Sequence, residues 1–255
     1  MHIQNYYNTY TYNYPPTFKN WKRDIIVPKK GLVNRNDTCF FREENFFPRL
    51  TKLISEEFKN IPKVNVYCYG CSDGSEPFTI AMRMLTMQDE TNPKKFLPII
   101  ARDIDPVAIK KVIDNDYKIT KNEKDYIEYF THGQYKRFFI QPNEGPDSQE
   151  GTQVFVRNEL YDNVNFGIGD IFKDLKKIKP KNTVLLARNF WPYIDGPQRR
   201  AFFRNLYNHL ESGSYFVTGD FDHSGICYQL NNLDYEITKY GFKRTPIKYV
   251  YKKEK

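Results

Sequence analysis

Apolar residues recur at spacings of three and four in the segment that follows Glu44, and this period predicts an amphipathic helix. The residues that set the period are Phe46, Phe47, Leu50, Leu53, Ile54 and Phe58. The next apolar run, residues 64–69, is short and continuous, and it predicts a buried strand that leads into Gly70. A second helical period then runs from 76 to about 88.

The same alternation of short apolar runs and helical periods continues along the chain. Strands are predicted over 96–101, 164–168, 183–187 and 215–217, and helices from Pro106 to about 113 and over about 197–210, with Gly213 ending the last helix. Residues 235–237 and 248–251 are predicted to form an edge hairpin. Strands that alternate with helices are typical of an α/β fold, in which helices cover both faces of a mostly parallel sheet.

Two segments depart from this alternation. Residues 135–140 and 153–156 are predicted to be antiparallel strands on either side of the turn-rich segment 143–151, which indicates an inserted small β-subdomain at about 126–164. Residues 1–36 are rich in Tyr and Asn and show no helical or strand period. We therefore expect an irregular N-terminal arm at 1–36 and one domain, with its insertion, at 37–255.

Charge and composition narrow the classes of partner. The 255 residues include 39 Lys and Arg against 31 Asp and Glu, a formal net charge of +8, which favours an acidic partner. Charge alone leaves open nucleic acid, an anionic cofactor or a Glu-rich protein surface. No apolar run is long enough to span a membrane, and residues 1–5 lack a signal-peptide pattern. With four cysteines in addition, we expect a cytoplasmic protein that does not insert into membranes.

The cysteines and histidines do not form a metal-binding pattern in the sequence. Cys68 and Cys71 make one C-x-x-C pair, but no second pair and no histidine accompany it. His132 and His223 lie away from any cysteine or acidic cluster with the spacing of metal ligands. We therefore expect no metal site, and we expect the two cysteines to be packing residues.

Parallel sheets bind ligands at the carboxyl ends of their strands, so the loops that follow each predicted strand are the places to search. After the first strand come Gly70 and Gly74, which allow a ligand close to the backbone, and Glu76, which can accept hydrogen bonds from an ammonium group. A plain turn explains the glycines equally well, and the loop lacks the G-x-G-x-x-G pattern of dinucleotide sites. Asp103 follows the second strand, where it either accepts from ribose hydroxyls or caps the next helix.

Two further loops carry polar residues at the same place relative to their strands. Asp170 is placed to accept from an adenine amino group while Ile171 covers the ring. Arg188 and Asn189 follow the next strand, and the arginine supplies a cation for a carboxylate. A nucleoside that carries an amino acid would use these groups together with those of the two preceding loops, and S-adenosylmethionine is such a molecule.

Four segments, in this order, resemble successive motifs of the CheR-type chemotaxis-receptor (protein-glutamate) methyltransferases. They are N-D-T-C-F-F-R at 36–42, G-C-S-D-G-S-E-P at 70–77, A-R-D-I-D at 101–105 and R-N-F-W-P-Y-I-D at 188–195. The resemblance covers about 36 to 225, and the T-x-F-F-R and R-N-x-x-x-Y-x-D elements are its most specific parts. It implies a class I S-adenosylmethionine-dependent methyltransferase fold, a Rossmann-like sheet with an inserted antiparallel β-subdomain.

The resemblance also implies which residues contact the cofactor, S-adenosylmethionine. Carried onto this sequence, the contacts fall on Asn36, Thr38, Arg42, Glu76, Asp103, Asp170, Ile171, Asn189 and Phe190. This chain has Ser75 and Glu76 where the family usually has two acidic residues, and Asp170 where the family has Asn; an acid there still accepts from adenine. The arm at 1–36 stands where the family typically has a helical N-terminal domain.

Arg42 and Tyr193 are the expected catalytic residues. A glutamate side chain, with an ordinary pKa of about 4.3, is ionised at neutral pH, so its methylation requires positioning and no general base. Arg42 would hold the cofactor or the incoming carboxylate through a forked contact, and Tyr193 would orient the carboxylate through its hydroxyl. Without the resemblance, an ion pair of Arg42 with Glu43 or Glu44 is the simpler role.

Three functions remain open from the sequence. The first is a methyltransferase that modifies accessible glutamates on a protein, with a chemoreceptor as the implied substrate. The second is a methyltransferase of the same fold that acts on a small molecule or a nucleic acid, which the charge and the missing helical domain favour. The third is a non-catalytic module that binds S-adenosylmethionine.

The inserted β-subdomain is the expected docking surface for a protein partner. It offers strand edges and the aromatic residues Tyr135, Phe138, Phe139 and Phe155. The alternative is that these aromatic residues only pack the subdomain onto the main sheet.

Overall fold

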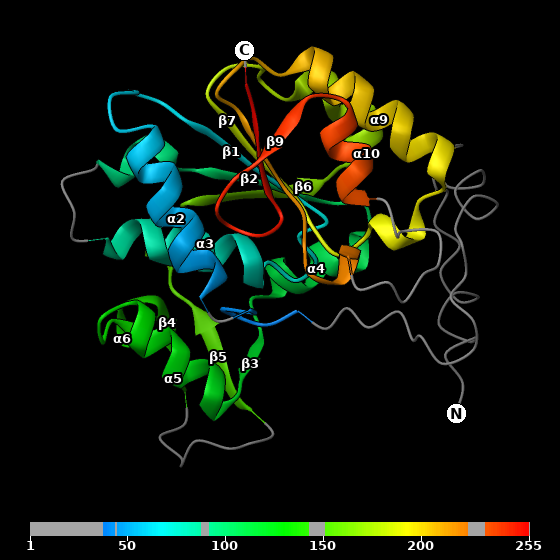
Figure 1. Ribbon diagram of the computed structural model, residues 1–255. Coiled ribbons are helices and arrows are strands. Elements are labelled where there is room, and N and C mark those ends of the chain that lie inside the picture. Colours follow the sequence, from blue (N-terminus) through cyan, green and yellow to red (C-terminus); the bar gives the residue numbers. More distant parts are fainter. Residues whose placement is uncertain (1–37, 44, 88–91, 143–150, 224–232, 255) are drawn as a thin grey trace, which may run out of the picture.

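The computed structural model describes residues 38–43, 45–87, 92–142, 151–223 and 233–254, and its centre is a seven-stranded sheet (Figure 1). The strands are β1 Asn65–Tyr69, β2 Ile99–Asp103, β6 Val164–Ile168, β7 Thr183–Ala187, β8 Tyr215–Val217, β9 Phe242–Arg244 and β10 Val250–Lys253. They lie in the order β6-β2-β1-β7-β8-β10-β9. The last strand, β10, is antiparallel to both neighbours, and the other neighbouring pairs are parallel. This is the class I methyltransferase fold that the sequence predicted.

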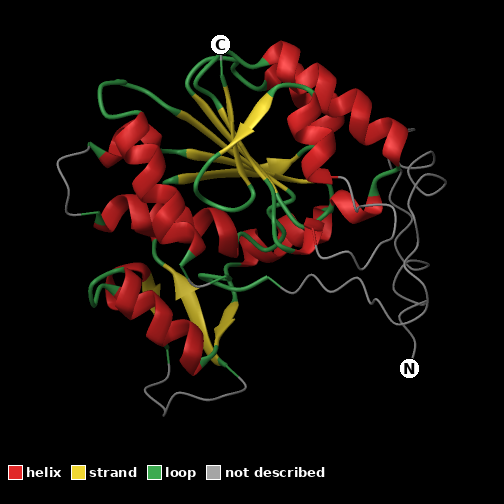
Figure 2. Ribbon diagram, in the orientation of Figure 1, coloured by secondary structure: helices red, strands yellow, loops and turns green. Residues whose placement is uncertain are grey.

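Helices cover both faces of this sheet (Figure 2). One face packs against α2 Phe46–Glu57 and α3 Ser75–Thr86, and the other packs against α9 Gly196–His209 and α10 Leu233–Lys239. Successive side chains of β1 and β7 point to opposite faces, so they join the two apolar clusters alternately. A further helix, α4 Pro106–Asp114, packs beside β2 and β6.

A separate three-stranded antiparallel sheet, in the order β3-β5-β4, lies beside the main sheet (Figure 1). Its elements, in chain order, are β3 Tyr117–Ile119, α5 Lys121–Phe130, α6 Tyr135–Phe138, β4 Phe139–Ile140, β5 Thr152–Val156 and α7 Asn158–Tyr161. They connect α4 to β6, as the predicted insertion does. The first strand of the small sheet begins at Tyr117, before the predicted start near 126, and α5 was not predicted.

Two predicted strands form helices instead. Most of 135–140 is α6, because Tyr135 and Phe138, three residues apart, are both buried, and only the last two residues pair as β4. Residues 235–237 lie within α10, where Leu233 and Ile237 are buried at a helical spacing of four. The strand that pairs with β10 is therefore β9.

The remaining elements are short. They are η1 Pro93–Phe96, α8 Ile171–Asp174, η2 Leu175–Lys177, η3 Trp191–Tyr193 and η4 Phe221–His223. The predicted arm at 1–36 lies outside the described residues, and so does most of the turn-rich segment 143–151. None of the helices in the described ranges has both the length and the apolar character that a membrane span requires.

The small sheet is fastened to the glycine loop that follows β1. The hydroxyl of Tyr117, on β3, donates to the backbone oxygen of Asp73 at 2.6 Å. Asp73 in turn accepts from the backbone N–H of Ser75 at 3.0 Å, at the start of α3. The turn between these residues requires Gly74, whose φ of 88° lies in the left-handed region. The insertion therefore helps to fix the loop from which α3 begins.

We expect Tyr117→Phe to lower the free energy of unfolding by about 0.5–1.5 kcal/mol, because it removes one partly buried hydrogen bond and keeps the ring. Urea unfolding monitored by circular dichroism measures the change. Tyr129→Phe is the control, since Tyr129 is 74% exposed and lies on α5 of the same insertion. Equal losses in the two variants would contradict the role of the Tyr117 hydroxyl.

Candidate functional site

The order of strands reverses between β1 and β7, which are adjacent in the sheet although distant in the chain. In open α/β sheets, ligands bind in the crevice at the carboxyl ends of the strands where the order reverses. Glu76 lies in the first turn of α3, directly after the β1 loop, and Asn189 lies in the loop after β7. The loops after β2 and β6 begin at the same edge of the sheet. The candidate cofactor residues of these four loops therefore share one edge of the sheet, as the sequence predicts.

The loop after β1 is built for close approach of the backbone. Gly70 has a φ of 73°, and a side-chain carbon placed there would lie 2.8 Å from Cδ1 of Phe190. A carbon placed on Gly74 would lie 2.9 Å from Cε1 of Phe166. Both positions therefore require glycine, and a plain flexible turn does not explain them. Phe190, a candidate cofactor residue, lies directly against this loop.

Asp103 is the last residue of β2, and its carboxylate accepts hydrogen bonds from the loop after β1 and from the loop after β2. Its Oδ2 accepts from the backbone N–H of Ser72 at 2.7 Å, and its Oδ1 accepts from the N–H of Asp105 at 2.9 Å. Burial raises the pKa of this carboxyl, and the backbone hydrogen bonds oppose the rise. The N-cap of α4 is Asp105, whose side chain accepts from Val107, so the alternative role of Asp103 as this cap is wrong.

Asp170 and Ile171 lie at the carboxyl end of β6. Asp170 caps α8 by accepting from the backbone N–H of Phe172 at 3.0 Å, and its carboxylate lies 3.8 Å from the ammonium of Lys173. Ile171 is buried in the same apolar cluster as α9. The structure therefore gives Asp170 a local role as the cap of α8, and its contact with adenine stays a prediction.

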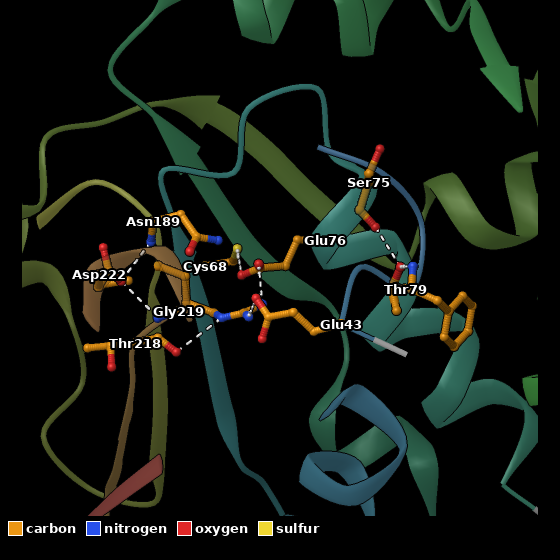
Figure 3. Close-up of polar contacts among 12 residues, drawn as sticks. Glu43, Cys68, Ser75, Glu76, Thr79, Asn189, Thr218, Gly219 and Asp222 are labelled. Carbon is orange, nitrogen blue, oxygen red and sulfur yellow. Dashed lines mark hydrogen bonds and ion pairs between the residues drawn. The ribbon is translucent and has the colours of Figure 1, made fainter. Parts of the chain in front are cut away.

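Arg188, which follows β7, is the centre of a buried ionic cluster. Figure 3 labels Glu43, Glu76 and Thr218, the partners of Arg188. Its Nη1 donates to Oε2 of Glu76 and its Nη2 donates to Oε1 of Glu43, both at 2.7 Å. Its Nε donates to the backbone oxygen of Thr218, at the end of β8, at 3.2 Å. The Arg188 side chain is 1% exposed. One guanidinium, from the residue after β7, thus joins the first turn of α3, the end of β8 and the turn before α2.

The surroundings of this cluster are apolar. The guanidinium carbon of Arg188 lies 4.4 Å and 4.9 Å from the ring centres of Phe46 and Phe47. Burial raises the pKa of Glu43, a change that Arg188 opposes and the nearby Glu76 reinforces. The thiol of Cys68 donates to Oε1 of Glu76 at 3.3 Å, and its own pKa is raised by burial. Cys68 is therefore a neutral packing residue with one polar contact.

Asn189 adopts a left-handed backbone conformation, with a φ of 64°. Its backbone N–H donates to Oδ2 of Asp222 at 2.7 Å, and its side-chain Oδ1 is buried. Within the described part of the chain this oxygen has no hydrogen-bond partner. Position 219 cannot carry a side chain, because a carbon added to Gly219 would collide with the Oδ1 of Asn189. A buried acceptor without a partner is the expected state of a residue that binds a ligand.

The remaining candidate residues lie in two segments near this edge. Thr38 and Arg42 are half-buried, and their segment is attached to α3 because the backbone N–H of Phe41 donates to Oγ1 of Thr79 at 3.1 Å. Tyr193 ends η3, half-buried, with its ring 6.1 Å from that of Phe221. Asn36 lies outside the described residues.

Sequence reasoning did not single out Glu43 or Asp222. Both are charged residues next to a motif or a strand: Glu43 follows Arg42, and Asp222 follows β8. The rule that led to Asp103 and Asp170, an acid shortly after a strand, would also have found Asp222. Nothing local would have found the contact between Glu43 and Arg188, which are 145 residues apart.

These groups fit S-adenosylmethionine by their chemistry. Two half-buried carboxylates, those of Glu43 and Glu76, bind the one guanidinium of Arg188, so the site favours a ligand with a cationic group. The unpartnered Oδ1 of Asn189 offers a further acceptor. No group of metal-ligating side chains occurs among the described residues.

Comparisons with known proteins agree with these features. A model of the family described as CheR methyltransferase, SAM binding domain, matches residues 36–225. The chain is 24% identical over 189 residues to chemotaxis protein methyltransferase 2 of Pseudomonas aeruginosa, which covers 74% of this chain and 64% of the relative. It is 24% identical over 216 residues to the chemotaxis protein methyltransferase of Borreliella burgdorferi, which covers 80% of this chain and 69% of the relative.

The chain therefore spans just under two thirds of the length of the Pseudomonas relative, at 64%. Among solved structures, it is similar to the N-methyltransferase NodS from Bradyrhizobium japonicum, at 12% identity and a TM-score of 0.42. That similarity covers 84% of this chain and 100% of the NodS chain.

Beside the ionic cluster, His223 is held as a neutral ring. Its Nε2 lies 2.8 Å from Oγ1 of Thr218, and its ring stacks on Tyr249 with centres 4.4 Å apart. Burial lowers the pKa of His223 from 6.5 to about 4. A group whose pKa is lowered on folding stabilises the fold above its unfolded pKa, and that contribution is lost as the pH falls through the folded value.

We expect the wild-type protein to lose more stability than His223→Gln between about pH 7.5 and about pH 5, because only the wild-type protein must keep this imidazole neutral while it is charged in the unfolded chain. Urea unfolding at both pH values measures the difference. Asp222 is present in both proteins, so its titration cancels. Equal pH dependence in the two proteins would show that His223 is not buried as a neutral ring.

Proposed function

Because the chain belongs to the CheR methyltransferase family, we propose that it transfers the methyl group of S-adenosylmethionine to glutamate side chains of a protein. The observation that carries the proposal is the edge of the sheet at the carboxyl ends of β1 and β7, where Glu76, Arg188 and Asn189 lie near a glycine loop. The resemblance of the T-x-F-F-R and R-N-x-x-x-Y-x-D segments to the family supports the choice of glutamate as acceptor.

In this proposal, each loop at the crevice holds one part of the donor. Glu76 binds the α-ammonium. The guanidinium of Arg188 is buried and already bound to Glu43 and Glu76, so it holds the Glu76 carboxylate in place and does not contact the α-carboxylate. Asp103 accepts from the ribose hydroxyls, and its two backbone hydrogen bonds keep the carboxylate aimed in one direction. Asp170 accepts from the adenine amino group. The buried Oδ1 of Asn189 gains the partner that it lacks in the described part of the chain.

The chemical step then depends on positioning. S-adenosylmethionine supplies an electrophilic methyl group on a sulfonium, and an acceptor glutamate, with its ordinary pKa of about 4.3, is already ionised at neutral pH. Holding two reactants in the reactive geometry lowers a barrier by roughly 7–11 kcal/mol, so acid and base groups are not needed. We assign the orientation of the acceptor carboxylate to Arg42, through a forked contact, and to Tyr193, through its hydroxyl.

We propose a chemoreceptor as the protein acceptor, because the curated relatives are named chemotaxis protein methyltransferases. The insertion is the proposed docking surface. Three of the aromatic residues expected there, Tyr135, Phe138 and Phe139, are buried in the core cluster, so they pack the subdomain and are not available to a partner. Among the residues of the insertion that the structure describes, the exposed large apolar side chains are Ile140, on the edge strand β4, and Tyr129.

The experiment that tests the function is incubation with labelled S-adenosylmethionine and candidate acceptors, followed by mild alkali. Release of the label from protein supports a glutamyl methyl ester. Label that stays on protein, or that appears on a small molecule or on nucleic acid, would assign a different acceptor to the same fold. Binding of S-adenosylhomocysteine without transfer to any acceptor would indicate a non-catalytic module.

We expect Asp103→Asn to weaken the binding of S-adenosylhomocysteine by about tenfold or more, because an amide replaces a charged acceptor of ribose hydroxyls and hydrogen bonds to charged groups contribute about 1.5–3 kcal/mol. Isothermal titration calorimetry measures the dissociation constant. Asp105→Asn makes the same change two residues away, where Asn is an equally good helix cap, and it should leave the affinity unchanged. Wild-type affinity in Asp103→Asn would refute the ribose contact.

We expect Tyr193→Phe to lower kcat by about tenfold or more, because a small misplacement of the acceptor carboxylate has a large effect on the rate. The dissociation constant for S-adenosylhomocysteine should stay within about twofold, since in this proposal the hydroxyl contacts the acceptor and not the donor. Tyr235→Phe, at an exposed tyrosine on α10, is the control for both measurements. Full turnover in Tyr193→Phe would remove this residue from the mechanism.

A further inference from the structure

Asp222 is fully buried, and its carboxylate accepts hydrogen bonds from three backbone N–H groups. Its Oδ2 accepts from Asn189 and from Gly219, each at 2.7 Å, and its Oδ1 accepts from Trp191 at 3.1 Å. Its side chain comes from η4, after β8, whereas Asn189 and Trp191 follow β7, so one carboxylate joins two loops (Figure 3). All three hydrogen bonds come from backbone N–H groups, so no side chain proposed to bind S-adenosylmethionine takes part in them.

The groups that Asp222 holds are nevertheless central to the crevice. Asn189 keeps a left-handed backbone that is unfavourable for a residue with a side chain, and its Oδ1 is the buried acceptor described above. Trp191 starts η3, which ends at Tyr193. The backbone on either side of Asn189 is therefore fixed by hydrogen bonds to a single carboxylate.

We propose that Asp222 is a positioning residue whose ionised carboxylate holds Asn189 in the conformation that binds the donor, so that donor affinity follows the ionisation of Asp222. This inference rests on the proposed function. Three N–H groups require acceptors, and the ionised carboxylate supplies only acceptors. A proton on either oxygen converts one acceptor into a donor that faces N–H groups. The neutral acid therefore loses or weakens at least one of the three contacts.

Asp222 changes its ionisation near neutral pH, where binding can be measured. Burial raises the pKa of Asp222 from 3.8 to about 7, against the three backbone hydrogen bonds and the positive charge of Arg188. The charged groups around it are Arg188, which stays ionised, and Glu43 and Glu76, which share that guanidinium. His223, next in the chain, has a pKa of about 4 and does not titrate near neutrality. Burial also raises the pKa of Glu43 and that of Asp103, so the test must separate Asp222 from both carboxyls. A rise in the dissociation constant that persists in Asp222→Asn would belong to one of them.

The test is calorimetry of S-adenosylhomocysteine binding between about pH 8 and about pH 6, with wild type, Asp222→Asn and Glu43→Gln. In wild type the dissociation constant should rise roughly three- to tenfold toward the lower pH, as the loss of one hydrogen bond implies. Glu43→Gln should keep this rise. Asp222→Asn should bind weakly at the higher pH and show no rise, and thermal unfolding confirms that it is folded.

Titration of the ligand itself is the same for all three proteins, so the difference between profiles isolates the protein group. A purely structural Asp222 would lower the thermal stability of Asp222→Asn and leave the pH profile of affinity unchanged, and that result would overturn the inference. So would a flat wild-type profile, or a rise that disappears in Glu43→Gln, and these two results do not require Asp222→Asn to fold. If wild type does not bind S-adenosylhomocysteine at all, the proposed function itself has failed.

Discussion

The buried guanidinium of Arg188 is the interaction on which the crevice depends. It is hydrogen-bonded to the first turn of α3, to the turn before α2 and to the end of β8, and those segments are not joined to one another locally in the chain. Removal of one partner from a buried ion pair leaves an uncompensated charge and costs about 3–5 kcal/mol. The carboxylates of Glu43 and Glu76 therefore keep the two segments in place, and the phenyl rings of α2 close the cluster from one side.

The main sheet was predictable because its signals are local. Short apolar runs mark β1, β2, β6, β7 and β8 within a few residues of their observed bounds, and the helices between them follow from spacing and from Pro or Gly at their ends. The failures have a common cause. At 135–138 and 235–237, apolar residues at helical spacing occur in segments too short to show the period, and contacts with α5 and α9 decide the structure.

The candidate site, too, has residues that the sequence predicts and contacts that it does not predict. Glu76, Asp103 and Asn189 could be selected because each follows its strand, and the topology of parallel strands then brings them to one edge. The partners of these residues could not be selected. The ion pair of Arg188 with Glu76 joins residues 112 apart, and the contact of Asp222 with Asn189 depends on how the loops after β7 and β8 pack. The sequence indicates which residues form the site. The hydrogen bonds and ion pairs that orient those residues depend on the tertiary structure.

On the proposed function, the carboxylates of the site also bear on the exchange of the spent donor. The whole chain carries a formal net charge of +8, yet at the site Glu43 and Glu76 share the guanidinium of Arg188. Transfer of the methyl group turns a positively charged sulfonium into a neutral thioether, while the rest of the donor keeps its shape. Coulombic attraction to the crevice therefore falls at the moment when the product must leave. In that proposal, the charge distribution that attracts the fresh donor holds the used one less strongly.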